Sequence, residues 1–96
     1  MARLLVIKIE LSAVQSADEL HFALSNALGF PGWYGQNWDA FWDAITGLVE
    51  MPVTLELVGW TIFSARLPRD AKLMQQCLKD MTTKYPDLAS EVHYLR

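Results

Sequence analysis

The sequence contains one cysteine, Cys77, and no long apolar segment. A single cysteine cannot form a disulfide within the chain, which favours a reducing compartment, so we expect a cytoplasmic protein. A secretory signal would need an uninterrupted apolar region near the N-terminus, where this chain has Lys8 and Glu10. No apolar run approaches the roughly 18 residues of a membrane span. We therefore expect no association with a membrane.

Positive charge is missing from more than half of the chain, since no lysine or arginine lies between positions 9 and 65. That window contains seven acidic residues, and the remainder has eight basic and four acidic residues, so the two parts carry −7 and +4. Uncompensated negative charge repels phosphates, which argues against direct binding of nucleic acid and favours a basic partner. The alternative is that these acids are ordinary solvated side chains.

The sequence also lacks the motifs that several kinds of chemistry require. The sequence has no phosphate-binding or dinucleotide-binding glycine motif and no cysteine or histidine pair at zinc spacing, so we expect no cofactor and no metal. His21 and His93 are isolated and are interpreted as surface or edge histidines. Cys77 lies on the apolar side of a predicted helix, which favours a packed thiol. Asp39 and Asp43 have the spacing of a glycosidase pair, but one exposed helix provides no cleft and no difference in environment. We do not expect an enzyme.

The length of 96 residues, 52% of them hydrophobic, predicts one domain over residues 1–96. Periodicity predicts, in order, a strand over 3–10, a helix over 16–28, a helix over 37–45, a strand over 53–58, one or two helical turns over 60–67, a helix over 69–84 and a strand over 91–95. Strands separated by helices need crossover connections. The predicted fold class is therefore α/β with a small, mostly parallel sheet.

Local signals fix several of these boundaries. Ser16 and Glu19 have the spacing of a capping box, and Gly29 stops the helix that follows. Asn37 is a suitable N-cap for the next helix, and Gly47 is expected to end it. In the first strand, Leu5 is expected to share a buried face with Ile7 and Ile9.

Residues 29–47, GFPGWYGQNWDAFWDAITG, contain three of the four tryptophans and two aspartates. On the helix over 37–45, Asp39 and Asp43 fall together on the solvated side, and Trp42 lies at the border of the apolar face. The helix dipole explains an acid in the first turn, such as Asp39, but does not extend to Asp43. Trp38 fits either the core or a contact surface. Trp33 lies in a loop where nothing requires burial, and exposed aromatic residues are typical of binding surfaces.

The run from Pro31 to Gly47, followed by an acid, Pro52 and the strand VTLEL, resembles the barstar family of intracellular ribonuclease inhibitors. The pattern aromatic-Tyr-Gly-x-Asn-x-Asp-Ala-x-Trp-Asp is long and unusual, and the resemblance is strong over residues 29–58. Outside this segment the order of the elements agrees, although the sequence similarity is weak.

The resemblance implies a three-stranded parallel sheet packed by helices, and an interface formed by the loop and the acidic helix. By motif position, the partner-binding residues are Trp33, Gly35, Asn37, Trp38, Asp39, Trp42 and Asp43. Asp43 matches the main binding hot spot of the family. A looser alignment adds Asp80 as a further acidic contact. The family also has a cis proline where Met51-Pro52 stands here.

The resemblance further implies that the chain is an antitoxin or immunity protein. It would be a monomer that forms a 1:1 complex with a basic, secreted, barnase-like ribonuclease and occludes its active site, with the aspartates replacing RNA phosphates. Trp33 stands in place of a tyrosine and Trp38 in place of a smaller aliphatic residue, which favours a cognate enzyme other than the best-known one. The alternative is a binding or immunity module for a basic protein that is not a ribonuclease.

Overall fold

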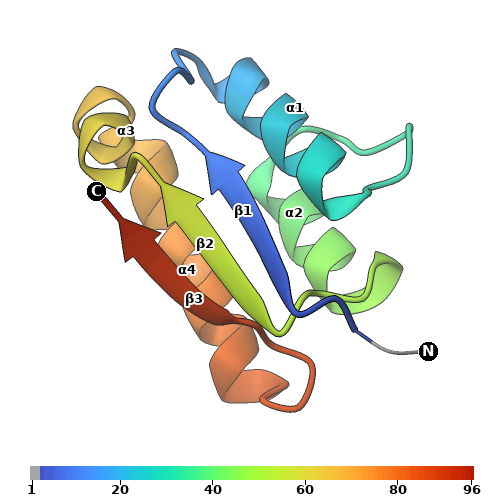
Figure 1. Ribbon diagram of the computed structural model, residues 1–96. Coiled ribbons are helices and arrows are strands. Elements are labelled where there is room, and N and C mark those ends of the chain that lie inside the picture. Colours follow the sequence, from blue (N-terminus) through green and yellow to red (C-terminus); the bar gives the residue numbers. More distant parts are fainter. Residues whose placement is uncertain (1–2) are drawn as a thin grey trace.

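The computed structural model describes residues 3–96, and its strands form one parallel sheet in the order β1-β2-β3 (Figure 1). The elements are β1 (Val6–Glu10), α1 (Ala17–Leu28), α2 (Trp38–Asp43), the π-helical segment η1 (Ala44–Leu48), β2 (Thr54–Val58), α3 (Trp60–Arg66), α4 (Pro68–Lys84) and β3 (Glu91–Leu95). The predicted fold class, α/β with a three-stranded parallel sheet packed by helices, is confirmed.

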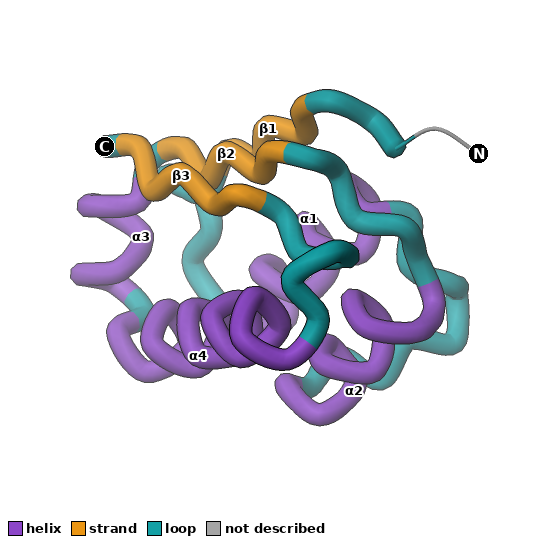
Figure 2. Tube along the Cα trace, turned by 90° about the horizontal axis from the view of Figure 1, so that it is seen from below, coloured by secondary structure: helices purple, strands orange, loops and turns teal. Residues whose placement is uncertain are grey.

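All helices lie on one side of the sheet, and its other side is uncovered (Figure 2). The core lies between the two layers. Leu55 and Leu57 alternate along the central strand and are buried, as are Phe63 of α3 and Met74 of α4. Because successive residues of a strand point to opposite faces, the intervening Glu56 lies on the uncovered side.

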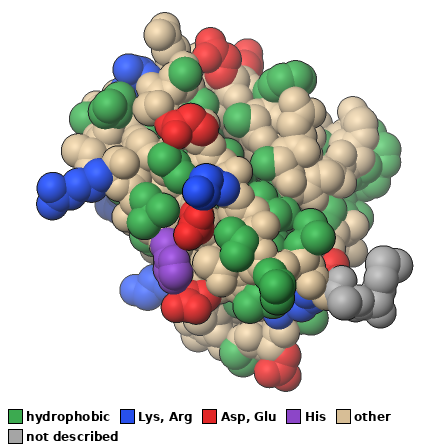
Figure 3. All heavy atoms as spheres, viewed as in Figure 1, with side chains coloured by type: hydrophobic (Ala, Val, Ile, Leu, Met, Phe, Trp, Pro, Cys, Tyr) green, Lys and Arg blue, Asp and Glu red, His purple; other side chains and the backbone are tan. Residues whose placement is uncertain are grey.

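The uncovered side of the sheet carries charged, histidine and apolar side chains close together (Figure 3). Lys8, Glu56 and His93 are register partners across the three strands. Lys8 Nζ lies 3.8 Å from Glu56 Oε1, and His93 Nε2 lies 3.2 Å from Glu91 Oε1. The expectation that His93 is an edge histidine is confirmed, since it is half-buried on the edge strand β3.

The helix α1 begins and ends as the sequence predicts. The side chain of Ser16 accepts a hydrogen bond from the backbone N–H of Glu19 at 3.1 Å, a cap that contributes about 1 kcal/mol. The Glu19 carboxylate accepts from the backbone N–H of Gln15 at 3.2 Å, one residue earlier than in the standard capping box. At the other end Gly29 has φ 74°, and its N–H bonds to the Ser25 carbonyl.

Two boundary predictions are wrong. Gly47 does not end the second helix, because η1 continues through it to Leu48 and the backbone N–H of Val49 bonds to the Ala44 carbonyl at 3.1 Å. Burial of Ala44 and Ile45 in this segment outweighs the low helical propensity of glycine. Leu5 is 76% exposed, because it precedes β1 and does not share the burial of Ile9.

The cis proline implied at Met51-Pro52 is also wrong, since the described residues contain no cis peptide bond. The chain instead has the ordinary trans form here. The Pro52 carbonyl accepts hydrogen bonds from Arg3 Nη2 at 2.8 Å and from Ser90 Oγ at 2.6 Å. These contacts fix the segment between η1 and β2 against the start of β1 and the start of β3.

Candidate partner-binding site

Asn37 fixes the start of α2 by using both ends of its side-chain amide. Its Oδ1 accepts from the backbone N–H of Ala40 at 2.7 Å, which is the predicted cap, and its Nδ2 donates to the Gly35 carbonyl at 3.1 Å. Gly35 packs closely against this cap, since an added Cβ would lie 3.3 Å from Asn37 Nδ2 and 3.4 Å from Ala40 Cβ. Both residues therefore set the geometry at the start of α2.

Asp39 and Asp43 lie one turn apart on α2, and both are exposed. Phe41 and Ile45 are buried on the opposite side of the same segment, as the helical wheel predicts. Within residues 3–96 neither aspartate forms an ion pair. Two neighbouring carboxylates that form no ion pair repel one another, so an arginine or lysine from outside the chain would bind them favourably.

A third carboxylate faces these two from α4, across a hollow of about 590 Å³ that we call the α2/α4 hollow. Its lining residues are Trp38, Asp39, Trp42, Asp43, Leu73, Gln76, Cys77, Asp80 and Lys84. Asp80 Oδ1 accepts a hydrogen bond from Gln76 Nε2 at 2.9 Å, which holds this carboxylate along α4. The structure therefore brings Asp80 to the same hollow as Asp39 and Asp43.

Trp38 joins the two helices that form the hollow. Its indole Nε1 donates to Asp70 Oδ1 at 3.0 Å, and its ring lies 5.2 Å from that of Phe41. Cys77 Sγ approaches the Trp38 carbonyl at 3.9 Å, and burial raises the pKa of this thiol, as expected for a packed cysteine. Trp38 is half-buried against the core and also lines the hollow, so its role as a partner contact stays a prediction.

Trp42 forms the aromatic border of the hollow together with a cation that the sequence interpretation missed. Lys84 Nζ lies 5.8 Å from the centre of the Trp42 ring, and Tyr85 packs 6.3 Å from the same ring. Such a contact between an ammonium group and an indole is weakly favourable at an exposed site. The available sequence signal pointed elsewhere, because a lysine in the last turn of a helix is explained by the helix dipole alone.

The loop between α1 and α2 presents Trp33 away from the hollow. Trp33 is 73% exposed and is absent from the hollow lining, so its exposure is settled but the structure does not bring it together with the aspartates. The next residue, Tyr34, anchors the loop: its hydroxyl lies 2.7 Å from His21 Nδ1, and its ring is 4.8 Å from Phe30. The loop is therefore held at its base while Trp33 remains free.

His21 is 2% exposed, so its interpretation as a surface histidine is wrong. The hydrogen bond with the Tyr34 hydroxyl compensates for burial of its Nδ1, and the Trp38 ring packs 4.6 Å from the imidazole. Burial lowers the pKa of His21, while Asp70 and Asp18 act in the opposite direction. Burial likewise raises the pKa of Tyr34. Helical spacing alone could not predict that His21, next to the buried Leu20, is buried as well.

Among residues 3–96 no group of three or more His, Cys, Asp or Glu side chains is placed to hold a metal ion. None of the helices in the same part of the chain is both long enough and apolar enough to cross a membrane.

The fold and the hollow together define a small α/β protein with an unpaired anionic surface between two helices. The chain belongs to the barstar family, described as "Barstar (barnase inhibitor)", which matches residues 4–95. It is also similar to a Bacillus subtilis (strain 168) protein named "Putative ribonuclease inhibitor YrdF", with 46% identity over 43 residues. This match covers 45% of the chain and 47% of that protein, about half of each length. The family is one of inhibitors, so the prediction that the chain is not an enzyme is confirmed.

Proposed function

We propose that the chain inhibits a basic, secreted ribonuclease of the barnase type by occluding its active site with the α2/α4 hollow. One observation carries the proposal: Asp39, Asp43 and Asp80 surround a hollow bordered by two indole rings, and Asp39 and Asp43 have no ion-pair partner within residues 3–96. Family membership and the name of the Bacillus relative support the ribonuclease as the partner.

The aspartates act as substitutes for RNA phosphates. A ribonuclease active site must bind a polyanion and therefore presents arginine, lysine or histidine, with which a carboxylate forms short charge-assisted hydrogen bonds. Asp39 and Asp43 are one turn apart, so they can meet two such cations in succession. Asp80 approaches from α4 and adds a third acceptor. The inhibitor performs no chemistry, because it only fills the site.

The aromatic residues exclude water around these ion pairs. Trp42 and the exposed edge of Trp38 border the carboxylates, and Trp33 extends the contact along the loop. Removing water strengthens each ion pair, and aromatic rims of this kind surround binding hot spots. Gly35 and Asn37 act mainly through the geometry of the α2 start, on which the direction of Asp39 depends.

The charge distribution steers association. The window from 9 to 65 carries no lysine or arginine, so its field attracts a basic enzyme and can raise the association rate by about 10–10³-fold at low salt. We further propose that the chain acts inside the cell as a monomer in a 1:1 complex, and that it protects its producer from a toxin made for secretion.

The proposal is tested by titrating the purified chain into a panel of barnase-type ribonucleases, barnase included, and following RNA hydrolysis. We expect stoichiometric inhibition of at least one enzyme, loss of that inhibition in Asp43→Ala, and an affinity that falls as salt rises. The matched control is Glu56→Ala, which removes an acid on the uncovered side of the sheet. Inhibition of no enzyme in the panel would reject the proposal, and so would full activity in a stable complex.

A basic protein without ribonuclease activity remains the alternative partner. It would be identified if the chain binds such a protein through Asp43 while leaving every ribonuclease of the panel active. In that case the anionic contact surface would remain as proposed, but the partner would be a protein other than a ribonuclease.

A further inference from the structure

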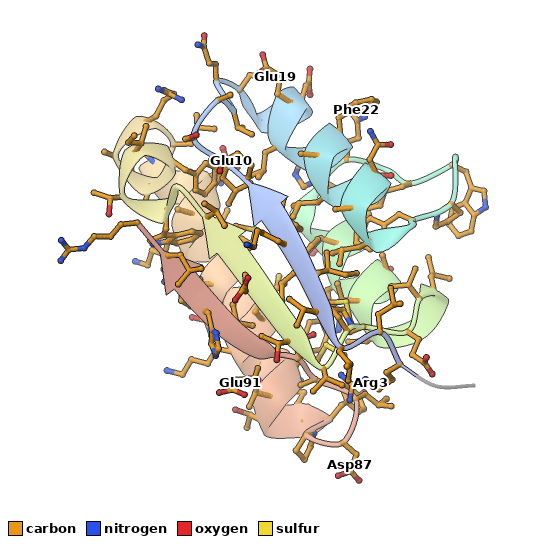
Figure 4. The ribbon with its side chains drawn as sticks, viewed as in Figure 1. Arg3, Glu10, Glu19, Phe22, Asp87 and Glu91 are labelled. Carbon is orange, nitrogen blue, oxygen red and sulfur yellow. The ribbon has the colours of Figure 1, made fainter. Side chains whose placement is uncertain are left out.

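A second, apolar groove lies on the outer side of α1, apart from the α2/α4 hollow. It is lined by Ala13, Val14, Asp18, Glu19, Phe22 and Gln36. Phe22 is 62% exposed, and Figure 4 shows Glu19 and Phe22 pointing outward from α1, away from β1. The groove thus combines an exposed aromatic ring with two carboxylates, and no basic residue lines it.

Folding does not explain Phe22. The helix α1 packs against the core through buried residues on its other side, namely Leu20, His21, Leu24 and Leu28. A phenyl ring that remains exposed in the folded chain contributes little to that packing. Single exposed apolar residues are common on protein surfaces, but here the ring forms part of two adjoining hollows, because Phe22 and Gln36 also line a hollow beneath the loop after α1.

Gln36 connects this groove with the loop of the proposed inhibitor site. It has φ 52°, the only positive φ among the described residues other than glycine. Glutamine adopts this left-handed conformation rarely, and such conformations concentrate at ligand contacts. The next residue, Asn37, caps α2. Along the chain, the wall of the α1 groove is therefore followed directly by the start of α2.

The charges of the groove indicate what it binds. Glu19 is engaged by the backbone N–H of Gln15, whereas Asp18 has no hydrogen bond or ion pair within residues 3–96. The guanidinium of Arg66 lies close to the groove, but it donates to the carbonyls of Ser12 and Val14 and forms no ion pair with either acid within residues 3–96. An arginine or lysine next to an apolar side chain complements Asp18 beside Phe22.

We propose that the α1 groove is a second contact for the same ribonuclease, which inserts an apolar side chain against Phe22 and directs an adjacent arginine or lysine to Asp18. The inference rests on the proposed function, because it assumes that the enzyme occupies the α2/α4 hollow. An interface of standard size includes about 20–30 residues on each side, which is enough to extend from the hollow across the loop to α1.

The test measures association and dissociation rates with the ribonuclease that the chain inhibits most strongly in the panel. We expect Phe22→Ala to dissociate about tenfold faster, as for a contact of moderate strength. Asp18→Asn should associate about two- to threefold more slowly at low salt and at the wild-type rate at high salt. The control Ile62→Ala removes a side chain that is 53% exposed on α3, and it should dissociate at the wild-type rate.

The variant Asp43→Ala separates the two proposals. If Asp43→Ala weakens binding while Phe22→Ala dissociates like the wild type, the α1 contact is rejected and the inhibitor function stands. If Asp43→Ala leaves binding unchanged, the proposed function itself fails. Equal acceleration in Phe22→Ala and Ile62→Ala would also reject the groove, because the effect would not be specific to α1. Thermal unfolding of each variant verifies that it is folded.

Discussion

The charged residues on the uncovered side of the sheet differ from those of the α2/α4 hollow in their partners rather than in their type. On the sheet, Glu56 and Glu91 each lie beside a basic side chain, Lys8 and His93 respectively. In the hollow three aspartates lie with a single lysine, Lys84, which lies over the Trp42 ring and forms no ion pair with them within residues 3–96. Acids that the fold has already paired gain little from a partner protein, whereas unpaired acids gain a full ion pair.

The difference between the two regions is tested most directly by replacing one acid in each with the corresponding amide, which removes the charge and keeps the shape of the side chain. Asp43→Asn should weaken binding of the ribonuclease by about 10³-fold, because a cation of the enzyme loses its buried partner. Glu56→Gln should leave the dissociation constant within about twofold, since Glu56 lies on the uncovered side of the sheet beside Lys8 and outside the α2/α4 hollow. Titration calorimetry measures both. Equal losses in the two variants would mean that overall charge, and not the hollow, determines affinity.

Arg3 represents the opposite extreme, a charge satisfied entirely by the fold. Its guanidinium donates to the carbonyls of Met51, Pro52 and Ala89 at 2.8 to 3.1 Å, at the end of the sheet where these segments converge (Figure 4). Arg3→Met keeps the apolar stem and removes this donor from all three carbonyls, of which Pro52 retains the hydroxyl of Ser90. We expect a loss of about 2–3 kcal/mol in the free energy of unfolding, measured in urea, with binding unchanged in the folded fraction.

The control for Arg3 is Arg69→Met, which removes the same charge from an exposed position near the start of α4. It should change the free energy of unfolding by less than about 0.5 kcal/mol. A loss as large as that of Arg3→Met would show that positive charge in general, rather than the carbonyl contacts, stabilises the fold.

The two histidines extend the comparison to pH. The pKa of His21 is lowered by burial, so the fold favours its neutral form. Stability from this group is therefore complete above the pKa of the unfolded histidine, about 6.5, and declines as pH falls through it. Between pH 6.5 and 5.5 we expect the free energy of unfolding to fall by at most about 1 kcal/mol, because the unfolded histidine is half protonated at the start of this interval and almost fully protonated at its end.

Urea unfolding at both pH values measures this loss in the wild type and in His21→Gln, where it should disappear. His93→Gln is the control, because His93 is half-buried at the edge of the sheet and lies beside Glu91. If His93→Gln removes the pH dependence instead, the buried histidine is not responsible for it.

The sequence predicts most of the fold because its signals are local. Alternation gives the strands, Ser16 and Asn37 give the helix starts, and Gly29 gives a stop. It fails at Gly47 and Leu5, where the outcome depends on which residues reach the core and not on propensity. His21 is buried by Tyr34 and Trp38, which lie in a later part of the chain, and the residues around His21 do not indicate this burial. The sequence therefore predicts a surface histidine where the structure has a buried one.

For the candidate site too, the sequence predicts the features that depend on local spacing and misses those that depend on packing. Spacing on one helix predicts the adjacency of Asp39 and Asp43, and a loose alignment indicates Asp80. Spacing cannot predict that α4 packs across from α2 so that Lys84 reaches the Trp42 ring, or that Trp33 stands apart from the hollow. These depend on how two helices pack, which no periodicity within either helix encodes.

The smallest effect is expected for Lys84, which is the one lysine or arginine that lines the hollow within the described residues. Lys84→Ala increases the negative field felt by a basic enzyme, so association should become about two- to threefold faster at low salt. At about 0.5 M salt, screening should remove the difference. Lys79→Ala removes the same charge from a different surface of α4, lined by Lys72 and Tyr94, and should have a smaller effect. Slower association or faster dissociation in Lys84→Ala would instead mean that Lys84 pairs with an acid of the enzyme, and that the hollow recognises a mixed rather than a purely basic surface.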